Sequence, residues 1–229
     1  MSKPSVIAID GPAAAGKTTL GHALAQELDY LYFDTGVMYR AVTLAALEES
    51  VDLVAEERVA ALARRIVIDV TEPTEADGRL ATVCIDGRDV THDLRSPTVD
   101  ANVSRVAAYP GVREAMTHQQ RRIAERGQLV MVGRDIGTVV LPDADLKLFL
   151  VADVETRARR RHQEYSQQGR SDSYDDILES MQQRDRRDRE REVAPLRAAP
   201  DAIRIDTSAQ STEEVLRLAL RLIEKINGA

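Results

Sequence analysis

The stretch Gly11-Pro-Ala-Ala-Ala-Gly-Lys-Thr-Thr19 decides the fold of this chain. It matches the pattern G-x-x-x-x-G-K-[ST] and follows the apolar run Val6–Ile9, which predicts a buried strand. Glycines let backbone N–H groups turn inward and form a nest for anions, and a helix that begins at Lys17 adds the positive end of its dipole. Lys17 would reach the outer phosphates of ATP, and the Thr18 hydroxyl would ligate Mg²⁺. The predicted ATP site comprises Gly11, Pro12, Ala13, Ala14, Ala15, Gly16, Lys17, Thr18 and Thr19.

Four further apolar runs follow the first one and alternate with helical patterns. They span residues 31–33, 129–132, 146–151 and 202–206. Short apolar strands that alternate with helices indicate a parallel sheet covered on both faces. The sequence therefore predicts an α/β fold of the P-loop NTPase class, with a five-stranded parallel sheet flanked by helices.

The segment from about residue 66 to 95 has a different pattern and predicts a β-rich insert. Residues 66–70 and 81–85 alternate as strands, Asp86-Gly87 is a strong hairpin signal, and residues 88–91 are the expected return strand. A helical pattern resumes at Ser104 and runs past Pro110 to Arg126, with Gly127 as its stop. Two very polar helices are expected over 154–168 and 175–191. Ser211 and Glu214 predict a capping box before the last helix.

Composition excludes several classes of protein. The 229 residues carry a net charge of −7, are 43% hydrophobic and 30% charged, and hold no apolar run near the 18–20 residues of a membrane span. An acidic chain with no Trp and two Phe is not expected to bind nucleic acid or a membrane surface. Cys84 is the only cysteine, which favours a reducing, cytoplasmic setting. We expect a monomer.

Arginines point to a second, anionic substrate. Only four of the 31 basic residues are lysines, and the arginine fork suits phosphate. Arg40 and Arg134 follow predicted strand ends, where open α/β sheets bind ligands. Arg184, Asp188 and Arg191 would share one face of a polar helix. No guanine-reading N-K-x-D run is present, so a small-molecule kinase is favoured over a GTPase.

Four motifs in order resemble the bacterial cytidylate kinases that carry an insert. These are Asp10-Gly-Pro-x-x-x-Gly-Lys-Thr18, Asp34-Thr-Gly-Val-Met-Tyr-Arg40, Gly133-Arg-Asp-Ile-Gly-Thr138, and Arg184-Asp-Arg-Arg-Asp-Arg-Glu-Arg191 with Ala194-Pro-Leu196 after it. The resemblance covers nearly the whole chain and implies the reaction ATP + CMP → ADP + CDP, with dCMP as a further acceptor and Mg²⁺ as cofactor.

The resemblance also implies roles for individual residues. Lys17, Arg134 and Arg191 would be catalytic, and Arg40, Arg134 and Arg191 would grip the phosphate of CMP. Ser104, Arg113 and Asp135 would read the cytosine, and Arg184 and Asp188 would contact the ribose, with Thr35 as an extra contact. Arg157, Arg161 and Arg170 are candidate lid arginines over ATP, and Asp34 is a candidate for contacting the metal through water.

A single nucleoside monophosphate kinase domain is expected over residues 1–229. Its core would be 1–35, 127–153 and 192–229, its monophosphate-binding region with the insert 36–126, and its mobile lid 154–191. Two alternatives remain open. A sugar or shikimate-type kinase would use Asp34 or Asp135 as a base toward a neutral hydroxyl. A nucleotide-dependent binding module would dock RNA on its arginine helices.

Overall fold

The computed structural model describes residues 4–167 and 169–228, and it divides into two compact units. Unit 1 comprises residues 1–28 and 130–229, and unit 2 comprises residues 29–129. Residues 1–3 and 229 of the expected core and Gln168 of the expected lid lie outside the described residues. Within the described ranges, no helix is both long and apolar enough to cross a membrane.

A five-stranded sheet with the order β2-β6-β1-β7-β8 confirms the predicted fold class. The strands are β1 (Val6–Asp10), β2 (Leu31–Asp34), β6 (Leu129–Gly133), β7 (Leu146–Val151) and β8 (Ile203–Asp206). In unit 1, β7 pairs in parallel with β1 on one side and with β8 on the other. All five residues of β6 are buried, as expected of a strand covered on both faces.

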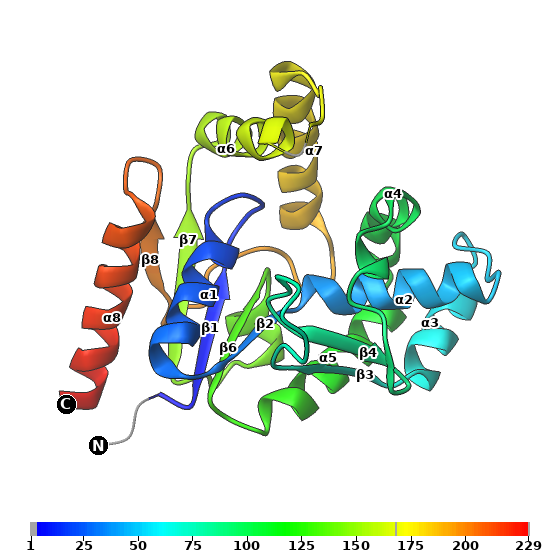
Figure 1. Ribbon diagram of the computed structural model, residues 1–229, viewed down its shortest axis with the longest axis horizontal. Helices are drawn as coiled ribbons and strands as arrows, with labels where there is room; N and C mark the ends of the chain where they lie inside the picture. Colours follow the sequence, from blue (N-terminus) through cyan, green and yellow to red (C-terminus); the bar gives the residue numbers. More distant parts are fainter. Residues whose placement is uncertain (1–3, 168, 229) are drawn as a thin grey trace. The chain divides into compact units, whose positions relative to one another are not determined.

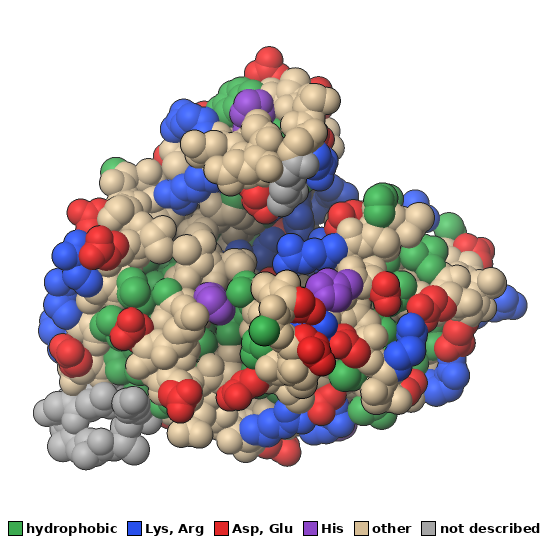
Figure 2. Space-filling model, in the orientation of Figure 1, with side chains coloured by type: hydrophobic (Ala, Val, Ile, Leu, Met, Phe, Trp, Pro, Cys, Tyr) green, Lys and Arg blue, Asp and Glu red, His purple; other side chains and the backbone are tan. Residues whose placement is uncertain are grey.

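Two helices of unit 1, α1 (Lys17–Leu28) and α8 (Thr212–Gly228), pack against each other (Figure 1). The predicted capping box of α8 is confirmed: Ser211 Oγ accepts from the Glu214 N–H at 3.2 Å, and Glu214 accepts from the Ser211 N–H at 2.8 Å. Buried Val215, Ala219 and Ile223 form the inner stripe of α8. Charged side chains cover its outer face, at the left of Figure 2.

The two polar helices of unit 1 are α6 (Val154–Gln167) and α7 (Tyr174–Glu190), which pack against each other. The Ser173 side chain caps α7 by accepting from the Asp176 N–H at 3.1 Å. Arg191 is the residue directly after the helix: its φ of −62° is helical and its N–H donates to the Arg187 carbonyl at 3.1 Å, so its side chain leaves from the helical face of Arg184 and Asp188, as predicted. Its ψ of 139° turns only the residues that follow, so the chain leaves the helix after Arg191.

Unit 2 contains the predicted insert as a separate antiparallel sheet of three strands in the order β3-β4-β5. The strands are β3 (Ile68–Thr71), β4 (Thr82–Ile85) and β5 (Arg88–Asp89). The return strand β5 is shorter than the predicted 88–91, because the Thr91 hydroxyl, at 2.9 Å, accepts from the Val83 N–H where a strand would offer a carbonyl.

The helices of unit 2 are α2 (Gly36–Glu48), α3 (Glu56–Arg65), α4 (Pro97–Val106) and α5 (Pro110–Ala124), with a 3₁₀ turn, η1 (Asp93–Arg95), before α4. The prediction of a helical pattern that starts at Ser104 is wrong, since α4 starts at Pro97. Proline is favoured in the first turn of a helix, where its missing N–H costs nothing, and both α4 and α5 begin with one.

Cys84 lies on the central strand of the small sheet, between two carboxylates. It is directly opposite Asp69 on β3 and Asp89 on β5. Burial raises the pKa of the Cys84 thiol, and the negative charges of Asp89 and Asp69 raise it further. The thiol is therefore held in its protonated form at neutral pH.

Asp10, the last residue of β1, fixes the segment that follows β6. One carboxylate oxygen accepts from the Ile136 N–H and the other from the Gly137 N–H, both at 2.8 Å. These amides open a single turn of π-helix, η2 (Ile136–Val140). Burial raises the pKa of Asp10 to about 6, although the two N–H donors and the Lys17 charge lower it. The carboxylate thus joins two neighbouring strand ends at an electrostatic cost.

Gly11 begins the glycine-rich loop in a conformation that only glycine tolerates. Its φ is +149°, and a Cβ at this position would lie 2.4 Å from the carbonyl oxygen of Leu150 on β7. The neighbour is backbone of a buried strand, so it cannot move aside as a flexible side chain would. The sheet therefore determines where the loop starts.

We expect the Gly11→Ala substitution to lower the free energy of unfolding by about 2–6 kcal/mol, since backbone strain and overpacking each cost roughly 1–3 kcal/mol. Gly78→Ala is the matched control, because Gly78 also has a positive φ (+87°) but nothing within 4 Å of its Cβ position. The control should lose about 1 kcal/mol. Chemical denaturation of both variants measures the difference, and equal losses would contradict the steric argument.

The raised pKa of Asp10 predicts how stability depends on pH. Between the ordinary carboxyl pKa of 3.8 and the folded value of about 6, the folded chain holds a proton that the unfolded chain has lost. The contribution of Asp10 to the free energy of unfolding therefore falls as pH rises from about 4 to 7, by about 3 kcal/mol in total. Denaturant unfolding of the wild type and of Asp10→Asn across this range isolates the effect. Parallel curves for the two proteins would contradict it.

Candidate active site

Three carbonyl groups of the glycine-rich loop between β1 and α1 accept hydrogen bonds from side chains. Lys17 Nζ donates to the carbonyl of Pro12 at 2.7 Å, Arg157 donates to that of Ala13 at 3.3 Å, and Thr207 donates to that of Ala15 at 3.1 Å. In a trans peptide the next N–H points opposite to the carbonyl. The N–H groups that follow these three carbonyls therefore point away from these partners, as an anion nest requires.

The predicted nucleotide-contacting side chains lie at the start of α1. Lys17 is buried, whereas Thr18 and Thr19 are exposed in the first helical turn. Among residues 4–167 and 169–228, no cluster of three or more His, Cys, Asp or Glu side chains could hold a metal ion. Mg²⁺ in kinases is usually held by one or two protein oxygens together with substrate phosphates, so the Thr18 hydroxyl fits this ion.

The predicted residues after β6 and on α7 form one charged cluster in unit 1. Arg134 Nε donates to Asp188 Oδ2 at 3.0 Å, and Arg191 Nη2 lies 3.4 Å from Asp135 Oδ1. Burial raises the pKa of Asp188, but the charges of Arg134, Arg184 and Arg191 outweigh burial, and the pKa falls below its usual value. The structure thus brings together all five residues of unit 1 that were predicted to bind the second substrate.

Four predicted residues lie in unit 2, together with the metal candidate. Thr35 is buried at the start of α2, and Ser104 is exposed on α4. Arg40 donates to Asp100 at 2.5 Å and to the carbonyl of Leu94 at 3.0 Å. Arg113, buried on α5, donates to the carbonyl of Ala107 and lies over the Tyr39 ring.

Asp34, the metal candidate, accepts from the Gly36 N–H at 2.9 Å. This bond holds one carboxylate oxygen at the turn between β2 and α2.

The three candidate lid arginines occupy different environments. Arg161 pairs with Glu164 on α6 at 3.0 Å, and Arg170 stacks 3.6 Å from the Tyr165 ring centroid. Arg157 is only 2% exposed and forms two hydrogen bonds to Asp185. Its contacts are those of an internal brace in unit 1.

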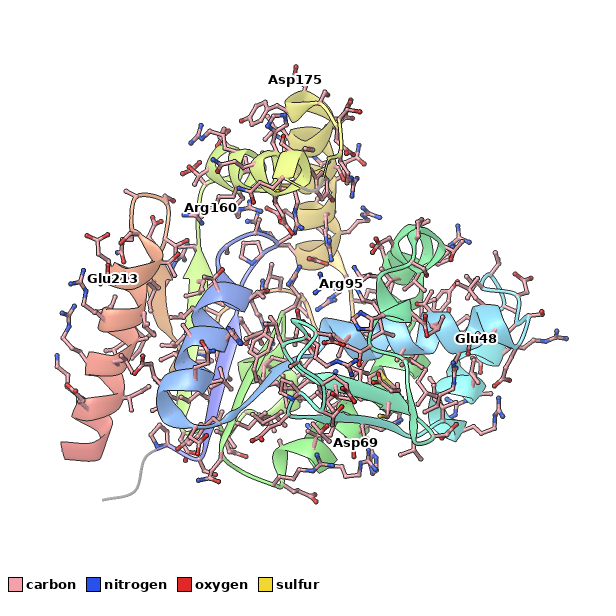
Figure 3. All side chains as sticks on the ribbon, viewed as in Figure 1. Glu48, Asp69, Arg95, Arg160, Asp175 and Glu213 are labelled. Carbon is pink, nitrogen blue, oxygen red and sulfur yellow. The ribbon has the colours of Figure 1, made fainter. Side chains whose placement is uncertain are left out.

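Sequence reasoning missed three residues that shape the site. Asp10 and Asp185 both lie inside the motifs quoted above, which was the available signal, but no role was assigned to either of them. Arg160 was also missed: it donates to the carbonyl and the hydroxyl of Thr207, in the loop after β8 (Figure 3).

Comparison with known proteins identifies a family. The family model described as cytidylate kinase matches residues 7–225. The cytidylate kinase of Limosilactobacillus reuteri is 49% identical over 226 residues, which cover 98% of this chain and 97% of that protein. That of Herpetosiphon aurantiacus is 51% identical over 223 residues, covering 97% and 96%. That of Bacillus subtilis is 46% identical over 225 residues, covering 98% and 99%.

A solved structure resembles this chain in fold alone. An uncharacterized protein from Eubacterium ventriosum matches with a TM-score of 0.53 at 13% identity, covering 96% of this chain and 98% of that one. The family assignment therefore comes from the near full-length sequence relatives and the family model. The chain belongs to the cytidylate kinase family.

Proposed function

We propose that this protein transfers the γ-phosphoryl group of ATP to CMP, giving ADP and CDP, and that it accepts dCMP as well. The observation that carries the proposal is that unit 1 holds two features whose chemistry suits phosphate: the glycine-rich loop, and the cluster of Arg134, Arg184 and Arg191 with two carboxylates. Two such features suit two phosphorylated substrates. The relatives named cytidylate kinase support CMP as the acceptor.

The donor side of the reaction rests on the loop and on Lys17. The loop N–H groups and Lys17 bind the ATP phosphates, and Lys17 leaves the carbonyl of Pro12 to follow the charge that develops on the transferring group. Thr18 holds Mg²⁺, which supplies positive charge to the phosphates when bound. Asp34 is a further candidate for contact with the metal through water. The lid arginines Arg161 and Arg170 contribute charge from α6 and the turn before α7.

The acceptor side rests on arginines that are paired with carboxylates before substrate binds. Arg40, Arg134 and Arg191 bind the CMP phosphate, with Thr35 as an extra contact. Arg184 and Asp188 bind the ribose hydroxyls. When the CMP phosphate binds Arg134, Asp188 becomes available to the ribose hydroxyls. When the same phosphate binds Arg191, Asp135 becomes available to the base.

Base recognition rests on Asp135, with Ser104 and Arg113. The carboxylate accepts from the cytosine amine, and the guanidinium donates to the carbonyl that cytosine shares with uracil.

No general base is required for this reaction. The acceptor is a phosphate with a second pKa near 6, so it is mostly dianionic at pH 7. The protein contributes position and charge. This separates the proposal from a sugar or shikimate-type kinase, in which Asp34 or Asp135 would have to take a hydroxyl proton. Asp135 already pairs with Arg191 at 3.4 Å, and a hydroxyl-activating role would leave the arginine cluster without a ligand.

For the cellular setting, we propose a monomer in the cytoplasm that acts without nucleic acid or a membrane. The single cysteine supports a reducing compartment. The net charge of −7 disfavours polyanionic partners.

The function is tested by measuring ADP release with CMP, dCMP, UMP, AMP and shikimate as acceptors. CMP and dCMP should give the highest kcat/KM. Lys17→Ala should lower kcat with CMP by roughly 10²–10⁴, because its charge stabilises the transition state more than the ground state. This variant is also the control for a contaminating kinase, which would give equal ADP release in the wild-type and variant preparations. Preference for shikimate, or full turnover by Lys17→Ala, would refute the proposal.

Asp135→Asn should erode the preference for CMP over UMP by roughly 10–100-fold, the cost of mispairing one buried polar group. The ionised carboxylate accepts from the cytosine amine and repels the uracil carbonyl, whereas an amide can turn to suit either base. Arg113→Met is the contrasting variant, because it should weaken both substrates with less change in their ratio. The measurement is kcat/KM for both nucleotides, and an unchanged ratio in Asp135→Asn would exclude base reading by this carboxylate.

A further inference from the structure

Arg157 is a charged side chain with almost no access to water. It is 2% exposed and lies on α6, in a lid that the sequence describes as very polar. Its Nε donates to the carbonyl of Ala152 at 3.0 Å, and Nη1 donates to the carbonyl of Ala13 in the glycine-rich loop at 3.3 Å. Arg157 therefore connects the lid to the start of the ATP-binding loop.

Asp185 on α7 supplies the counter-charge. Its two oxygens accept from Nη1 and Nη2 of Arg157 at 3.1 and 2.5 Å, and its own side chain is 7% exposed. Bidentate geometry holds the guanidinium plane in a fixed orientation. Removing one partner of such a pair leaves an unpaired buried charge, which is strongly destabilising. The orientation of Arg157 thus depends on α7 as well as α6.

Apolar contacts at the same place join the loop to the lid. Ala13 is buried with Ala158 of α6 and with Ile177 and Met181 of α7 in one cluster. The position of Ala13 is thereby fixed through its side chain. Its carbonyl is fixed separately, through Arg157.

The next residue, Ala14, has a backbone conformation that needs such support. Its φ is +56°, in the left-handed region that costs a non-glycine residue roughly 1–2 kcal/mol. The Ala13 carbonyl and the Ala14 N–H belong to one trans peptide unit and point in opposite directions. A donor that holds this carbonyl therefore sets the direction of the Ala14 N–H.

We propose that Arg157, held by Asp185, is a positioning residue for ATP: it orients the Ala13–Ala14 peptide unit so that the Ala14 N–H faces the donor phosphates. This rests on the proposed function, in which the loop binds ATP. It gives Arg157 a role in binding without contact with the nucleotide, in place of the direct phosphate contact expected of a lid arginine. It also makes the affinity for ATP depend on a carboxylate of α7.

The test compares three variants with the wild type. Asp185→Asn removes the counter-charge. Arg157→Lys keeps the charge but cannot reproduce the fork. The double variant Arg157→Met with Asp185→Leu replaces the buried pair with apolar groups of similar size, a change that is often neutral for stability. Calorimetry with ATP alone, in the absence of any acceptor, gives the Kd, thermal unfolding gives Tm, and turnover gives KM for each substrate.

The expected result is an ATP Kd and KM raised about 10–100-fold in all three variants, because one oriented hydrogen bond to a charged phosphate is lost. KM for CMP should change less than about threefold, and the double variant should keep a Tm near that of the wild type. Glu179→Gln on α7 and Arg159→Lys on α6 are matched controls, because both side chains are exposed. The first neutralises a carboxylate as Asp185→Asn does, and the second replaces a guanidinium with an amine as Arg157→Lys does.

Two results would overturn the inference. One is wild-type ATP affinity in the double variant, which would make the pair a purely structural brace. The other is an equal loss of ATP and CMP affinity in the variants, which would indicate general damage. A wild-type protein that binds ATP but does not phosphorylate CMP would refute the proposed function and leave this test valid, because ATP binding is measured without an acceptor.

Discussion

The carboxylate of Asp10 is the contact on which the rest of unit 1 depends. It ends β1 one residue before the glycine-rich loop, and its two oxygens accept from consecutive amides that follow β6. The two oxygens satisfy both N–H groups, whereas an apolar residue would leave two buried donors unpaired. The segment that carries Arg134 and Asp135 is thereby held in register with the start of the ATP loop. Burial of the Asp10 carboxylate is unfavourable by itself, but the carboxylate supplies the acceptors for these two amides.

Pairing of opposite charges explains how an acidic chain is suited to two anionic nucleotides. Arg134 and Arg191 each face a carboxylate within unit 1, and Arg40 faces one within unit 2. Under the proposed function a substrate phosphate replaces one anion by another, so the guanidinium groups never lose a counter-charge. The released carboxylates then meet hydroxyl and amine donors. Binding becomes an exchange of partners, which avoids a large desolvation cost.

The sequence was a good guide where local chemistry decides the outcome. The loop pattern with Lys17, the five apolar strands and the capping box at Ser211 were all correctly predicted, because each depends on a few neighbouring residues. It was a poor guide where contacts between segments distant in sequence determine the position of a side chain. The burial of Arg157 follows from a partner far along the chain, and residue spacing carries no information on it. Helix α4 begins earlier than predicted for a local reason: Ser96 followed by Pro97 is a typical start of a helix.

The position of Cys84 has a consequence for chemical durability. Thiolate, not thiol, reacts with peroxides and disulfides, and a raised pKa keeps the thiolate fraction small. The only sulfur in the chain able to form a mixed disulfide is therefore poorly reactive. Thiol reagents should therefore modify this chain slowly at neutral pH.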